Sequence, residues 1–115
     1  MGKMQREKGA RFERHLASLL RDEGFHDAER TAQHSGKNGG EPDVKGLPGI
    51  HIEAKHQEKM CLYDWMDQAK RDVAEKKSTD IPVVMHKKNN AEILVTMRFD
   101  DWVKIYREYV AGISE

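Results

Sequence analysis

Two carboxylates and one ammonium group lie close together in the sequence, at Asp43, Glu53 and Lys55. The segments around them have the composition of short β-strands, and the run Gly46-Leu47-Pro48-Gly49 between them predicts a turn. A turn of this length can bring Asp43 alongside Glu53. We therefore expect both carboxylates and the ammonium group to converge on one spot.

The second of these strands, around residues 50–55, should present two different faces, because side chains two apart point to the same side of a strand. One face is apolar and is expected to point into a core (Ile50, Ile52, Ala54), and the other is polar (His51, Glu53, Lys55). The alternative is an exposed hairpin at the edge of a sheet whose charged face is only solvated.

Two nearby carboxylates repel each other unless a positive charge lies between them. Mg²⁺ suits such a site because it takes hard oxygen ligands and retains waters that a phosphate can replace. Mn²⁺ would fit similar ligands. Lys55 could orient or deprotonate a water molecule. The residue types and their spacing therefore predict metal-assisted cleavage of a phosphodiester.

Residues 4–23 are expected to form an amphipathic helix that ends at Gly24. Its apolar stripe consists of Phe12, Leu16, Leu19 and Leu20. Glu13 lies at the edge of this stripe, where a carboxylate needs a partner. The residues four positions away, Gly9 and Ala17, carry no charge for an i,i+4 ion pair. We therefore expect Glu13 to face the metal site, as a ligand or through a water molecule.

Composition restricts the class of protein. The chain has 115 residues, of which 37% are hydrophobic and 35% charged. A single domain over residues 1–115 with a modest core is expected, and the apolar periodicity argues against disorder. The sequence shows neither an apolar run of membrane-spanning length nor a secretory signal. The one cysteine, Cys61, cannot form an internal disulfide, so a cytoplasmic location without membrane contact is predicted.

The charge balance is uneven along the chain. The formal net charge is zero, which alone argues mildly against a nucleic-acid partner. Residues 1–21, however, carry six basic side chains and two acidic ones. Lys8 and Arg11 within this segment are candidate contacts to DNA phosphates.

Two motifs resemble a known superfamily. Pro42-Asp43 followed by Glu53-Ala54-Lys55 resembles the signature of the PD-(D/E)xK nucleases. The run Lys8-Gly9-Ala10-Arg11-Phe12-Glu13-Arg14, with its following leucines and Gly24-Phe25, is similar to the opening helix of the archaeal-type Holliday junction resolvases, a branch of that superfamily. The likeness covers residues 8–70 and is only architectural from residue 81 onward. It implies an α/β, restriction-endonuclease-like fold, with a central mixed β-sheet flanked by helices.

The resemblance also implies roles for individual residues. Asp43, Glu53 and the backbone carbonyl of Ala54 would hold the metal ion, and Glu13 would occupy the position of the active-site glutamate on the helix. Lys55 would position or activate the attacking water.

Further residues follow from the same resemblance. Gln68, on the expected helix 62–77, matches a glutamine that points back to the active site, although Gln57 is a nearer competitor and Gln68 could equally be solvated. In the glycine-rich loop 34–40, Ser35 and Lys37 would contact the DNA backbone.

The remaining strands and the last helix are predicted from the spacing of apolar residues. Residues 26–33 predict a first strand, and the unbroken apolar run 81–85 predicts an interior strand that forms a hairpin with 92–96. Residues 99–110 predict a final helix. Its apolar face consists of Trp102, Val103, Tyr106 and Val110. We expect this face to pack on the sheet, with a dimer seam as the alternative.

Together these patterns predict a Mg²⁺-dependent DNA endonuclease. The resemblance favours a Holliday junction resolvase that acts on branched DNA as a homodimer, because symmetric incision of two strands needs two active sites. The alternatives are a VRR-NUC-like or nicking nuclease of a phage or mobile element, an RNA nuclease with the same core, and a non-catalytic DNA-binding module that retains the fold. The presence of Asp43, Glu53 and Lys55 together favours an enzyme.

Overall fold

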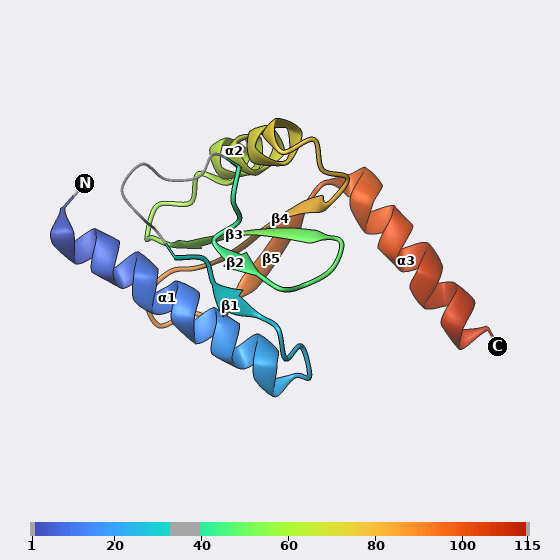
Figure 1. Cartoon of the computed structure of the whole chain (residues 1–115), viewed down its shortest axis with the longest axis horizontal. Coiled ribbons are helices and arrows are strands. Elements are labelled where there is room, and N and C mark those ends of the chain that lie inside the picture. The colour runs from blue at the N-terminus through green and yellow to red at the C-terminus, as the bar shows by residue number, and fades with distance from the viewer. Residues whose placement is uncertain (1, 33–39, 115) are drawn as a thin grey trace.

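The computed structural model of the chain describes residues 2–32 and 40–114. Within these residues, three helices and five strands follow one another along the chain (Figure 1). Their order is α1 (Lys3–Asp22), β1 (Glu29–Arg30), β2 (Val44–Lys45), β3 (Ile50–His56), α2 (Leu62–Glu75), β4 (Ile81–Lys87), β5 (Leu94–Met97) and α3 (Phe99–Ile113). The strands form one sheet in sequence order, with β3 and β4 parallel and the other neighbours antiparallel. The prediction of an α/β fold with a central mixed sheet is confirmed.

Helix α1 covers one face of the sheet. Its buried side chains Phe12, Leu16 and Ala17 pack with Ile52 and Ala54 of β3. The predicted stripe is confirmed except at Leu19, which is exposed. The helix ends before Gly24, which has a φ of 105° and donates its backbone N–H to the carbonyl of Arg21, as expected for a residue that terminates a helix.

Helix α2 covers the opposite face and forms the crossover that the parallel pair β3–β4 requires. Trp65 and Met66 pack on Val84 of β4. Val84 lies next to Glu53 in the β3–β4 register, so Glu53 lies beneath this helix. The alternative of an exposed edge hairpin is therefore wrong: β3 lies between β2 and β4, and Glu53 is only 1% exposed.

The strands differ from the prediction mainly in length. The first strand, expected over 26–33, is reduced to β1, because it pairs with an equally short β2. Asp43 lies just before β2 rather than inside it. The interior strand and its hairpin partner are confirmed as β4 and β5.

Helix α3 does not pack on the sheet, and that prediction was wrong. It extends away from the body of the molecule (Figure 1), and among the described elements it has no extensive packing partner. The physical reason is that α1 and α2 already occupy the two faces of the sheet. Among the described residues, no helix is both long enough and apolar enough to cross a membrane.

Candidate active site

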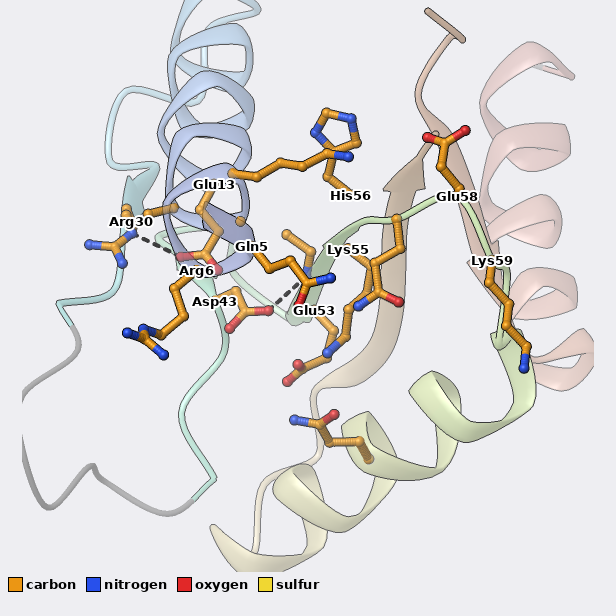
Figure 2. A pocket seen from close by; sticks show the side chains of 16 residues that line it. Gln5, Arg6, Glu13, Arg30, Asp43, Glu53, Lys55, His56, Glu58 and Lys59 are labelled. Atoms are coloured by element: carbon orange, nitrogen blue, oxygen red, sulfur yellow. Dashed lines mark hydrogen bonds and ion pairs between the residues drawn. The ribbon is translucent and has the colours of Figure 1, made fainter. Parts of the chain in front are cut away.

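A cleft of about 740 Å³ opens where α1, β3 and α2 meet beside β2 (Figure 2). The side chains that line it come from segments far apart in the sequence. Six of them are the residues for which catalytic or metal-binding roles are predicted from the sequence: Glu13, Asp43, Glu53, Ala54, Lys55 and Gln68. Gln57 also lines the cleft, so both candidate glutamines lie at the site.

The cleft collects residues from both faces of the sheet because β2 and β3 separate at this point. Val44 pairs with Ile52 in the strand register, and the Asp43 backbone N–H still donates to the Ile52 carbonyl at 2.8 Å. Two residues further along β3, the acceptor is a side chain and no longer a backbone carbonyl: the Ala54 N–H donates to Asp43 Oδ2 at 2.8 Å. The N–H and C=O of one strand residue face the same neighbour. The Ala54 carbonyl oxygen therefore points to the same edge of β3.

Glu53 is the most buried carboxylate of the site. Its Oε1 lies 3.1 Å from His51 Nε2, and ligand atoms of His51, Glu53 and Asp72 lie within 4.8 Å of one another. Burial raises the pKa of Glu53 to about 9, with further contributions from Asp43 and Asp72. His51, Glu53 and Asp72 are thus a second group of donors, beside Asp43 and the Ala54 carbonyl, that could hold a metal ion.

Sequence reasoning did not identify His51 and Asp72 as candidate metal ligands. A signal existed for both. His51 shares a strand face with Glu53, and Asp72 follows Gln68 by four residues on α2 and so lies on the same side of the helix.

Glu13 has a partner that the sequence did not identify. Arg30 of β1 donates from Nε to Glu13 Oε1 at 2.8 Å (Figure 2). The pKa of Glu13 is nevertheless raised to about 7, because burial and the nearby Asp43 outweigh the effects of Arg30 and Lys55. The sequence predicts that Glu13 needs a partner, and Arg30 is one. Glu13 also lines the cleft, as expected for a residue that faces the metal site.

Lys55 is the cation that the three carboxyl groups share. Burial also raises the pKa of Asp43, opposed by the Ala54 N–H and by Lys55. Lys55 acts in the same direction on Glu13 and Glu53. Raised pKa values at three neighbouring carboxyl groups mean that the site favours added positive charge, as protons or as a cation. Hard oxygen donors in this number suit Mg²⁺ or Mn²⁺.

The candidate DNA contacts lie at the rim of the cleft or outside the described residues. Lys8 lines the cleft. Lys8 and Arg11 also line a shallower hollow of about 440 Å³, together with His56 and Asn89. The predicted contacts Ser35 and Lys37 fall in residues 33–39, which lie outside the described part of the chain.

A mixed sheet that brings Asp43, Glu53 and Lys55 to one cleft, with Glu13 supplied by the first helix, defines the class of the PD-(D/E)xK nucleases. Comparison with protein families gives the same result. Residues 4–113 match a family described as "phage putative PDDEXK endonuclease". The match spans almost the whole chain, and the protein belongs to this family. Searches of curated proteins and of solved structures returned no match.

Proposed function

We propose that this endonuclease-family protein cleaves DNA with the help of Mg²⁺ and that its preferred substrate is branched. The observation that carries the proposal is the convergence of Asp43, Glu53, the Ala54 backbone and Lys55 in one cleft. The basic side chain of Lys8 at the same cleft offers a contact for a phosphate backbone.

The donor set fits a divalent cation. Asp43, Glu53 and the Ala54 carbonyl would hold it, and Glu13 would join directly or through a water molecule. Such an ion, when bound, polarises the scissile phosphate and neutralises developing negative charge. Manganese would serve with the same oxygen ligands.

The chain itself supplies the remaining functions. The Ala54 N–H fixes the orientation of the Asp43 carboxylate, and His51 does the same for Glu53. Lys55 would orient the attacking water and stabilise negative charge at the phosphate. Gln68, which reaches the cleft from α2, would position water or substrate.

A four-way junction is the substrate we favour, on the strength of the resemblance of α1 to the opening helix of the resolvases. Paired incision would need two copies of the cleft, so a homodimer belongs to this proposal. The family description, a phage endonuclease, also fits the second candidate, a VRR-NUC-like or nicking nuclease that cuts as a single copy.

The first experiment tests the metal site. In the Glu53→Gln variant, we expect Mg²⁺-dependent cleavage to fall by a factor on the order of 10²–10³, while junction binding in gel-shift assays persists. Glu29→Gln, an exposed carboxylate on β1, is the matched control and should cut normally. Equal activity of wild type and Glu53→Gln would contradict the assignment of the site.

The second experiment tests the substrate. Labelled four-way junction, flap, linear duplex and RNA should be compared under the same Mg²⁺ concentration. We expect the junction to be cut fastest. Equal cutting of linear duplex and junction would reject the resolvase proposal and leave the nuclease proposal in place, whereas cleavage of RNA alone would reject the DNA substrate.

A further inference from the structure

The last helix presents an apolar face that its own chain leaves exposed. Five large side chains recur along α3 at alternating spacings of three and four residues. They are Phe99, Trp102, Tyr106, Tyr109 and Ile113, with exposed fractions of 74%, 48%, 48%, 61% and 66%. Spacings of this kind place side chains on one seam of a helix, as in the a and d positions of a coiled coil.

The residues beside this seam are apolar as well. Val103 and Val110 flank it on one side and Ile105 on the other, and Ile105 and Val110 are also exposed. The charged side chains fall on the remaining part of the helix: Asp100, Asp101, Lys104, Arg107 and Glu108. Asp101 is buried and forms ion pairs with Arg98 and Lys104. The apolar face is therefore wide, and it bears no charge that would repel an identical face.

A helix in this situation needs a partner for its stability. Isolated helices shorter than about 12–15 residues are marginal in water, and α3, with 15 residues, lies at that limit. Ring contacts within the helix, such as the stacking of Trp102 on Tyr106 at 5.0 Å between centroids, order the side chains but leave their outer faces in water. Exposed apolar patches larger than a few hundred Å² mark interaction surfaces.

We propose that α3 is the surface through which two copies of this chain associate, seam against seam. Aromatic side chains bury about 150–250 Å² each when covered. Four aromatic and several aliphatic side chains per copy therefore offer an area on the order of the roughly 800 Å² per partner that a stable interface needs. The zero net charge of the chain adds no long-range repulsion between copies.

The same face fits a second copy better than it fits nucleic acid. Platforms that stack bases combine aromatic rings with a positively charged groove. On α3, aliphatic side chains flank the rings, and Asp100 and Glu108 accompany the two basic residues of the helix. Burial of this face against its own copy leaves these charges at the solvent-exposed rim.

The association gives the dimer proposed for paired incision its contact surface, but it does not depend on cleavage. The proposal of association through α3 and the proposal of cleavage can therefore fail separately, because the molar mass of the full chain is measured without metal or DNA. By sedimentation velocity at about 10–100 µM chain, where interfaces of this area are populated, we expect the wild type to have twice the mass of one chain.

Two seam variants test the surface. Tyr106→Lys and Ile113→Lys each bury an ammonium group in the seam of the dimer and should weaken association by a factor of at least about 100. Both side chains are exposed in the single chain, so neither change disturbs its core. Glu108→Lys places the same ammonium group on the outer side of the helix and should leave the mass unchanged.

Two results would overturn the proposal. The first is a wild type that stays monomeric at about 100 µM, and the second is a dimer that persists in both seam variants. In a monomeric wild type, quenching of tryptophan fluorescence by a single-stranded oligonucleotide that is lost in Trp102→Phe, where Trp65 is the remaining tryptophan, would assign the face to base stacking.

Discussion

At the scale of single residues, the chemistry of the cleft depends on the competition between burial and positive charge at its carboxyl groups. Lys55 lowers the pKa of Glu13, Asp43 and Glu53 alike, yet burial keeps all three raised. Arg30 also lowers the pKa of Glu13, to which it donates a hydrogen bond. The site therefore gains from a further cation, and Lys55 lowers the pKa of all three carboxyl groups.

Replacement of Lys55 should lower the cleavage rate without an equal loss of affinity for the junction. In Lys55→Met we expect the cleavage rate to fall by a factor on the order of 10²–10⁴, because the group that orients water and offsets charge is lost. Single-turnover cleavage and junction affinity should be measured together. Lys45→Met, an exposed lysine on β2, is the matched control. A loss of binding as large as the loss of rate would instead assign Lys55 to substrate docking.

Arg30 should set the acid limb of activity through Glu13. Arg30 lowers the pKa of Glu13, which nevertheless remains at about 7. In Arg30→Gln that pKa should rise further, so the deprotonated form needed for metal binding appears only at higher pH. We expect the acid limb of the rate–pH profile to move to higher pH. An unchanged profile in a folded variant would show that Glu13 does not take part.

At the scale of elements, the turn between β2 and β3 decides whether Asp43 reaches Ala54. Gly46 and Gly49 both have positive φ, at 101° and 81°, a backbone region that disfavours other residues. They differ in their surroundings. A Cβ at Gly46 would overlap the Asp27 carbonyl, whereas a Cβ at Gly49 would meet no atom within 4 Å.

These two glycines form a matched pair for mutagenesis. Gly49→Ala should lower the free energy of unfolding by about 1 kcal/mol, the backbone cost alone. Gly46→Ala should lower it by roughly 1–3 kcal/mol more, because overpacking is added, and should reduce cleavage by displacing β2. Urea titration of both variants measures the difference. Equal losses in both would mean that the Asp27 segment moves aside without cost.

At the scale of the whole molecule, the buried carboxyl groups of the cleft make the free energy of unfolding depend on pH. The ordinary pKa of a glutamate is near 4.3, whereas the pKa values of Glu13 and Glu53 are raised to about 7 and about 9. Between about pH 4.3, the ordinary pKa, and about pH 9, the higher raised pKa, the folded chain binds more protons than the unfolded chain. The contribution of these groups to the free energy of unfolding is therefore largest at low pH and is lost as the pH rises through about 9.

Magnesium should counter this loss. A ligand at 100 times its dissociation constant stabilises the folded state by about 2.7 kcal/mol, and deprotonated carboxyl groups bind it best. We expect Mg²⁺ to raise the melting temperature more at pH 8 than at pH 5. Thermal melts with and without the ion measure the effect, and Glu53→Gln should show a smaller increment at pH 8. An increment that does not depend on pH would argue against a carboxylate site.

The sequence by itself determined the elements and most of the site. The apolar stripes of α1 and α2 and the alternation in β3 are local patterns, set by the periods of helix and strand, so Phe12, Ile52 and Trp65 could be placed in the core before any fold was known. Asp43, Glu53 and Lys55 could be paired for the same reason, because a short turn limits where two adjacent strands can go.

Only the tertiary structure decided which distant groups meet. Arg30 on Glu13 and Asp72 beside Glu53 depend on how α1 and α2 lie on the sheet, which no local period encodes. The exposure of α3 was likewise undetermined, because an amphipathic stripe shows that a face must be covered but not by what. In this chain, α1 and α2 had already taken both faces of the sheet, and the third apolar helix is left outside.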